Sequence, residues 1–205
     1  MIGIINYGSG NLQAIKNIYN RLNIPAFIAD SADSLKNAER LILPGVGAFD
    51  ETMGKLNSSG LIDKLNELVL VKNVPVLGIC VGMQIMAKSS DEGESEGLGW
   101  INAKVEKLKS KNAKGEAVLL PHMGWNSVKQ EKENHLFNGI DPEKGFYFLH
   151  SYHFVCKKKE DVLAKTNYGD VLTSAISTLN IYGTQFHPEK SHSNGIQIFK
   201  NFSEI

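Results

Sequence analysis

Cysteine, net charge and long apolar runs are all scarce in this chain, and each shortage excludes a class of protein. Two cysteines among 205 residues, Cys80 and Cys156, cannot build a disulfide framework, and they suit a reducing compartment where a thiol stays free. Lys and Arg number 22, as do Asp and Glu, so a net charge of zero gives no general electrostatic reason to bind nucleic acid or an anionic membrane. No apolar run approaches the ~20 residues of a membrane span, and residues 1–6 show no basic leader, so we expect a soluble, cytoplasmic protein.

The order of predicted elements favours one α/β domain over residues 1–205. Strand patterns alternate with helical spacing in the first half, whereas the second half is rich in strand patterns and closes with a helix. We therefore expect a single mixed, mostly parallel central sheet flanked by helices. The predicted helices are 12–22, a short one after 31, 50–56, 61–69, 83–88 and 193–202. The predicted strands are 1–6, 25–29, 40–43, 74–79, 99–101, 103–108, 117–120, 125–128, 146–155, 162–165, 172–176 and 181–186.

A Gly-X-Cys-X-Gly turn at residues 78–82 is the stretch around which the rest is organised. An apolar strand runs into it and a helix-favouring run follows, which is the pattern of a nucleophile elbow. Side chains at Gly78 and Gly82 would collide as the chain reverses, and the residue between them is held in a strained conformation. Cys80 is thus a candidate nucleophile at a helix start, where a thiolate is favoured. The alternative is a buried cysteine between two packing glycines.

A cysteine nucleophile needs a base and a group that orients the base. Of six histidines, His187 follows a predicted strand, and Pro188 stops that strand from continuing. In an extended segment, Glu189 would project to the same side as His187 and hydrogen-bond to one imidazole nitrogen. The alternative is a turn with a surface ion pair. No spacing of His, Cys or carboxylates indicates a zinc site, so we expect neither metal nor cofactor.

Cys-His-Glu supports acyl transfer through a thioester, whose oxyanion needs backbone donors. The N–H of Val81, next to the nucleophile, is one candidate donor. The Pro-Gly-Val-Gly loop at residues 44–47 is a source of the second, because it follows a strand at the edge where open α/β sheets place their sites. A second Gly-rich turn, at residues 8–10, lacks the third glycine of a dinucleotide fingerprint and the lysine of a P-loop, so a plain turn or a partner-facing loop is favoured over a phosphate site.

These residues resemble class I (triad) glutamine amidotransferases along the full length of the chain, and most of all the glutaminase-subunit type of imidazole glycerol phosphate synthase. The elbow and the His-Pro-Glu segment are shared by the whole class, whereas PHMGWN is specific to this subunit type. The resemblance implies a flavodoxin-like core. It is carried by NYGSGN at 6–11, LPGVGAF at 43–49, GICVGMQ at 78–84, PHMGWN at 121–126, HSY at 150–152 and GTQFHPEKS at 183–191.

The resemblance also implies roles for individual residues. Cys80 would be the nucleophile in the hydrolysis of L-glutamine to glutamate and ammonia, His187 the base and then the acid, and Glu189 the orienting group. Gly47 and Val81 would supply the oxyanion hole. The positions that match those holding the amino-acid end of glutamine are Gln84, Ser151 and Tyr152. The positions that match the surface facing a (β/α)₈ cyclase partner, which receives the ammonia for histidine biosynthesis, are Asn11, Pro121, His122, Met123, Trp125, Asn126 and Lys190.

Three other functions stay open on the sequence. Val81 stands where the family more often has Leu, and residues 87–101 look more like paralogues that are thought to supply ammonia for the amination of surface-polysaccharide sugars. A stand-alone cysteine hydrolase or peptidase on a related scaffold would use the same three side chains. A catalytically silent binding subunit would need a broken triad, and Cys80, His187 and Glu189 are all present.

Overall fold

A sheet of eight strands forms the centre of the computed structural model, which describes residues 1–205. Its order is β2-β1-β3-β4-β13-β12-β11-β8; neighbours from β2 to β13 pair in parallel, and those from β13 to β8 pair antiparallel. The predicted mixed sheet is confirmed. Its strands are β1 (Ile2–Ile5), β2 (Ala26–Ala29), β3 (Arg40–Gly45), β4 (Val76–Cys80), β8 (Lys129–Gln130), β11 (Val162–Tyr168), β12 (Asp170–Thr178) and β13 (Ile181–Thr184).

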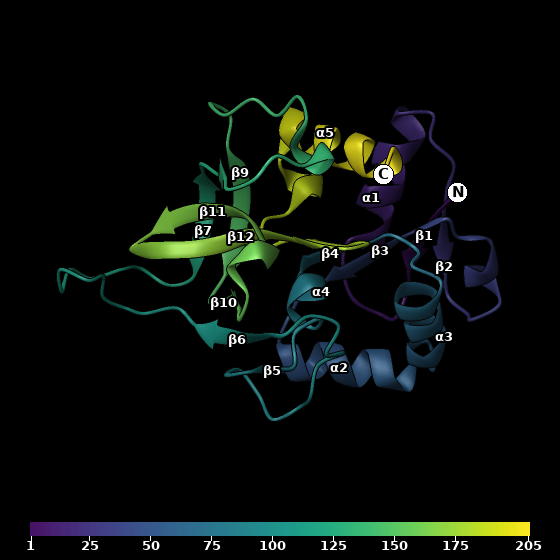
Figure 1. The fold of residues 1–205 in the computed structure, drawn as a ribbon, viewed down its shortest axis with the longest axis horizontal. Coiled ribbons are helices and arrows are strands. Elements are labelled where there is room, and N and C mark those ends of the chain that lie inside the picture. Colours follow the sequence, from purple (N-terminus) through teal and green to yellow (C-terminus); the bar gives the residue numbers. More distant parts are fainter.

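Helices cover both faces of this sheet. In Figure 1, α1 (Leu12–Arg21) and α5 (His192–Ser203) lie on one side of it, and α2 (Phe49–Ser58) and α3 (Ile62–Asn66) lie on the other. The helix predicted at 61–69 divides into α3 and a π-helical turn, η2 (Glu67–Val71), and the one predicted after residue 31 is a 3₁₀ turn, η1 (Ser34–Asn37). No helix has the length and apolar character needed to cross a membrane.

Two small sheets form the rest of the second half. Strand β7 (His122–Asn126) pairs with β9 (Phe146–His150), and β10 (Tyr152–Cys156) pairs with β6 (Ala103–Lys107), which also pairs with β5 (Ser89–Ser90). The single strand predicted at 146–155 is therefore wrong. The chain bends at Ser151 because its two halves pair with different partners. The predictions of extended structure at 99–101 and of a strand at 117–120 are also wrong, since the latter segment has only an isolated bridge between Lys111 and Ala117.

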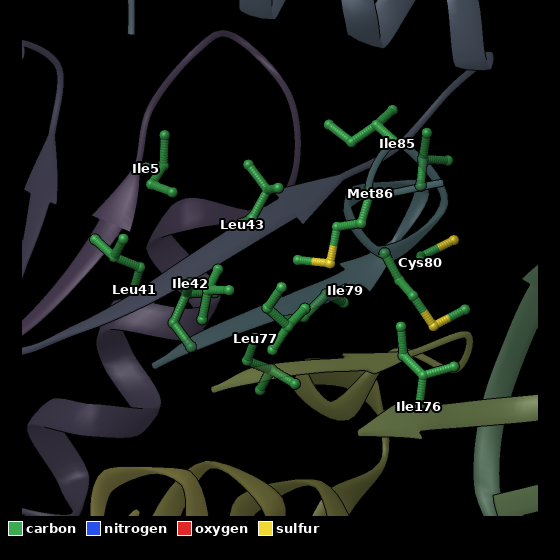
Figure 2. Close-up of a cluster of buried hydrophobic side chains, with 14 of the residues drawn as sticks. Ile5, Leu41, Ile42, Leu43, Leu77, Ile79, Cys80, Ile85, Met86 and Ile176 are labelled. Carbon is green, nitrogen blue, oxygen red and sulfur yellow. The ribbon is translucent and has the colours of Figure 1, made fainter. Parts of the chain in front are cut away.

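The apolar core lies where the parallel strands are covered on both faces. Every residue of β1 and β4 is buried, as expected for strands with a helix layer on each side. Figure 2 shows side chains of β3 and β4, among them Leu41, Leu43 and Leu77, packed together, with Cys80 at the end of β4. The nucleophile candidate is thus attached to a fully buried strand of the core.

The register of the central strands brings their carboxyl ends to one edge. Leu43 of β3 and Gly183 of β13 both lie opposite Gly78 of β4, and Gly45 lies opposite Cys80. Loops that leave these three strands therefore begin side by side. They carry the predicted oxyanion loop, the elbow and His187, and this is the edge at which ligands bind in open α/β sheets.

Candidate active site

The elbow has the geometry that its glycines predict. Cys80 has a φ of 54° and a ψ of −112°, a strained conformation for a residue with a side chain. A Cβ on Gly82 would lie 1.9 Å from the carbonyl oxygen of Leu43, and one on Gly78 would lie 2.7 Å from Cα of Met83. The helix that follows, α4 (Val81–Gln84), has only four residues, so its dipole contributes less to the site than the prediction of a helix at 83–88 supposed.

His187 and Glu189 meet as predicted, although not in the predicted conformation. The Nδ1 of His187 lies 2.8 Å from Oε1 of Glu189, and both side chains are almost fully buried. The segment is not extended, because Pro188–Lys190 forms a 3₁₀ turn, η5, which His187 precedes. The turn is secured by Ser191, whose hydroxyl donates to the His187 carbonyl and accepts from the N–H of Tyr147 on β9.

The environment of His187 favours its protonated form. Burial alone would lower the pKa of this imidazole, but the Cys80 sulfur and the Glu189 carboxylate together outweigh burial and raise the pKa to about 10. The ring therefore carries protons on both nitrogens at neutral pH. It lies between the Cys80 sulfur on one side and the Glu189 carboxylate on the other. This arrangement can move a proton between a thiol and a leaving group.

A cavity of about 310 Å³ opens beside the sulfur. Of the residues predicted for catalysis, the oxyanion hole and glutamine binding, all but Glu189 line this cavity, and Glu189 lies behind His187. The lining residues are Val46, Gly47, Cys80, Val81, Gln84, Glu92, Pro121, Leu149, His150, Ser151, Tyr152, His187 and Lys190. No group of three or more His, Cys, Asp or Glu side chains lies close enough together to hold a metal ion.

Glu92 is a cavity residue that the sequence analysis missed. It lies in the acidic stretch 91–97, which has no pattern of a binding site in the sequence, and only the fold brings it to the cavity. Its Oε2 accepts a hydrogen bond of 2.8 Å from the N–H of Phe49, the first residue of α2. Lys190 also lines the cavity, so the wall includes one acidic and one basic side chain.

Gly47 and Val81, whose backbone N–H groups are the predicted oxyanion donors, both line the cavity. Val81 is the first residue of α4, so its N–H has no acceptor within that helix. Gly47 has a φ of 101°, which glycine adopts without strain. The neighbouring Val46 is held by Ser9, whose hydroxyl accepts from the Val46 N–H at 2.9 Å and donates to its carbonyl at 3.0 Å. The Gly-rich turn at 8–10 therefore contacts this loop.

Exposed apolar side chains lie on the cavity wall and on the strand beside it: Val46 and Leu149 line the cavity, and Met123 of β7 lies opposite Leu149 of β9. Val46, Met123, Trp125 and Leu149 are each more than a third exposed, and we call these four residues the docking face. Of the other residues predicted to face a partner, Asn11, Pro121 and Lys190 are exposed and Asn126 is half-buried. His122 is only 2% exposed, so its predicted place on the surface is wrong: it points inward from β7 while Met123 points out.

Comparisons with known proteins agree with this site. The family model "Glutamine amidotransferase class-I" matches residues 4–205. The chain is 51% identical to the imidazole glycerol phosphate synthase subunit HisH of Bdellovibrio bacteriovorus and 47% identical to that of Leptospira borgpetersenii, over the full length of all the chains.

Solved structures share the fold at lower identity. A crystal structure titled glutamine amidotransferase superposes with a TM-score of 0.71 at 22% identity, covering 100% of this chain and 99% of its own. The PurLQS structure from Thermotoga maritima gives 0.72 at 16% identity, covering 98% and 96%. With the family model matched over nearly the whole chain, the protein belongs to the class I glutamine amidotransferase family.

Proposed function

We propose that this chain is the glutaminase subunit of an imidazole glycerol phosphate synthase, acting as one domain over residues 1–205 in the cytoplasm. The observation that carries the proposal is the convergence of Cys80 and His187 on one cavity, with Glu189 bonded behind the ring. Full-length relatives between 40% and 51% identical, all named as this subunit, support the choice of pathway.

The reaction has two halves, in which a thioester forms on Cys80 and is then hydrolysed. The Cys80 sulfur attacks the side-chain carbonyl carbon of glutamine, and the N–H groups of Val81 and Gly47 bind the oxygen as it becomes negative. The C–N bond breaks, and His187 passes its proton to the departing nitrogen, so ammonia leaves. Water then attacks the thioester and gives its proton to His187, the C–S bond breaks, and glutamate is released with the thiolate restored.

The polar lining of the cavity suits the amino-acid end of glutamine. The Glu92 carboxylate attracts an α-ammonium group, and the Lys190 ammonium an α-carboxylate. Gln84, Ser151 and Tyr152 also line the cavity and add polar groups to its wall. The α-ammonium and α-carboxylate groups of glutamine would thus each meet a side chain of opposite charge.

The docking face is where we place a (β/α)₈ cyclase subunit that consumes the ammonia. Its residues are apolar and exposed, and two of them, Val46 and Leu149, line the cavity, so a partner seated there would cover the exit and keep ammonia from water. Asn11, Pro121 and Lys190 extend this surface. Trp125 is its best anchor, since tryptophan is enriched among residues that dominate interface energies.

Cys80→Ala tests the chemistry. With the cyclase subunit bound, this variant is expected to lose glutamine-dependent synthesis of imidazole glycerol phosphate and to keep the reaction driven by added ammonium salt. Survival of both reactions would remove Cys80 from the mechanism. Rapid hydrolysis of peptides or esters by the isolated wild-type chain would favour a stand-alone hydrolase, and ammonia transfer only to a sugar-aminating partner would favour the surface-polysaccharide role.

Trp125→Ala tests the docking face. Loss of the indole is expected to weaken binding of the cyclase subunit about 30-fold, which corresponds to about 2 kcal/mol. Isothermal titration calorimetry measures this directly. Val71→Ala is the matched control, because Val71 is exposed but lies just before β4, at the opposite edge of the sheet. Equal effects of the two substitutions would exclude this face.

A further inference from the structure

Three side chains form a continuous hydrogen-bonded line beneath the cavity. Asn126 Nδ2 lies 3.2 Å from Nε2 of His122, and Nδ1 of His122 lies 2.9 Å from Nε2 of His150. The Nδ1 of His150 lies 2.9 Å from the backbone carbonyl oxygen of Tyr152. The line therefore runs from β7, through the end of β9, to the first residue of β10.

Only one arrangement of protons satisfies the whole line. The Asn126 amide is oriented by its other contacts, since its oxygen accepts from the Ser127 N–H and its nitrogen donates to the Asn167 carbonyl. Its nitrogen must then donate to Nε2 of His122. At the other end, the Tyr152 carbonyl can only accept. Both imidazoles are thereby fixed as neutral Nδ1–H tautomers, each accepting at Nε2 and donating at Nδ1.

The surroundings keep the two rings neutral. His122 and His150 are 2% and 7% exposed, and His122 is stacked between Phe148 and Tyr168, with ring centroids 4.5 Å and 3.9 Å away. Burial lowers the pKa of His122 to about 4. For His150, burial, assisted by the nearby His122, His153 and His187, outweighs the bond to the Tyr152 carbonyl and lowers the pKa to about 3.

The line ends on the bend that forms one wall of the cavity. The bond from His150 to the Tyr152 carbonyl spans Ser151, the residue at which β9 gives way to β10. The same carbonyl accepts a second bond, of 2.9 Å, from the side-chain amide of Gln84. Gln84, His150, Ser151 and Tyr152 all line the cavity, so the carbonyl joins the hydrogen-bonded line to the substrate wall.

We infer that His122 and His150 are positioning residues for glutamine. Their fixed tautomers hold the bend that presents Ser151 and Tyr152 to the cavity. They also tie that bend to β7, whose outward residues Met123 and Trp125 belong to the docking face. The inference rests on the proposed function, because it names glutamine as the ligand of this wall. A partner that shifts β7 would thus act on the glutamine site through two buried rings.

Two substitutions of His150 separate the ends of the line. In His150→Asn the amide nitrogen occupies the position of Nδ1 and keeps the donor to Tyr152, whereas in His150→Gln the amide occupies the position of Nε2 and loses that donor. His150→Gln is expected to raise KM for glutamine about tenfold while kcat changes less, because one hydrogen bond to the wall is lost. His150→Asn is expected to restore most of the affinity. His135→Gln, on an exposed turn, is the control for removing a histidine.

Nitrogen-15 NMR of histidine-labelled protein tests the line without any assay of activity. Both rings are expected to show the Nδ1–H tautomer and no titration between pH 5.5 and about 8.5. An Nε2–H tautomer or a midpoint near 6.5 at either ring would overturn the line, and an unchanged KM in His150→Gln would overturn the positioning role. If His150→Gln does not fold, His122→Phe serves in its place. It removes the donor to His150 while keeping an aromatic ring between Phe148 and Tyr168, and an unchanged KM in that variant overturns the role equally.

The proposed function can fail separately. A wild-type complex that releases no ammonia from glutamine would overturn both the function and the positioning of glutamine. An active wild-type complex with the wrong tautomers would overturn the inference alone.

Discussion

The carboxylate of Glu189 is buried and contacts one ring nitrogen of His187. Its Oε1 bonds to His187, and its Oε2 is buried without a hydrogen-bond partner. A buried carboxylate with one unpaired oxygen is costly, and such cost is expected where the charge has a use. The use here is to raise the pKa of His187 and to fix the ring with Nδ1 toward Glu189, which leaves Nε2 for the sulfur side.

Glu189→Gln keeps an oxygen near His187 and removes the charge. Because that charge is one of the influences that raise the pKa of His187, the pKa is expected to fall from about 10. The rate of glutamine hydrolysis is expected to fall about 10²-fold or more, since the ring is then less able to carry the proton between sulfur and ammonia. The pH profile of kcat/KM and the NMR titration of His187 measure the two effects. Glu204→Gln is the control, because it removes the charge of a carboxylate that pairs with another histidine: Oε2 of Glu204 lies 3.4 Å from Nε2 of the exposed His135. An unchanged titration of His187 in Glu189→Gln would contradict the account.

At the scale of elements, features that depend on neighbouring residues could be predicted from the sequence, and features that depend on residues far away in the chain could not. The elbow was predictable because the glycines that allow it are within two residues of Cys80. The break at Ser151 was not, because residues 146–155 favour a strand throughout, and only the separate pairing of β9 with β7 and of β10 with β6 divides them. Glu92 was missed for the same reason: its acceptor role depends on Phe49, 43 positions away.

Alanine substitution at two glycines, Gly82 in the elbow and Gly54 in α2 as a comparison, tests how closely the elbow packs against β3. Gly54 lies at an exposed position in α2, where an added Cβ has no atom within 4 Å, so Gly54→Ala is expected to raise the free energy of unfolding by about 0.5–1 kcal/mol. Gly82→Ala would place its Cβ against the Leu43 carbonyl and is expected to lower it by about 1–3 kcal/mol or more. Urea unfolding measures both. Equal stability of Gly82→Ala and the wild type would show that β3 and the elbow do not pack as closely as described.

At the scale of the whole molecule, two neutral histidines make folding sensitive to acid. In the unfolded chain an imidazole has a pKa of about 6.5, whereas the pKa of buried His150 is about 3 and that of His122 about 4. Depressed values mean that the unfolded chain binds more protons once the pH falls below about 6.5. The stability that these rings contribute is therefore complete above that pH and is lost as the pH falls toward 4 and 3.

Measurement of the free energy of unfolding from pH 7 to pH 4 tests this dependence. Each such ring is expected to add a slope of about 1.4 kcal/mol per pH unit below its unfolded pKa, since one proton is taken up on unfolding. His150→Gln removes one of these protons, so its curve is expected to be shallower than the wild-type curve by about that slope, whatever its stability at pH 7. Carboxylates with lowered pKa, such as Glu67 at about 2, act on both proteins alike and cancel in the difference. Parallel curves for the two proteins would mean that His150 takes up its proton at the same pH in the folded chain as in the unfolded chain, and the neutral line from Asn126 to Tyr152 would then be wrong.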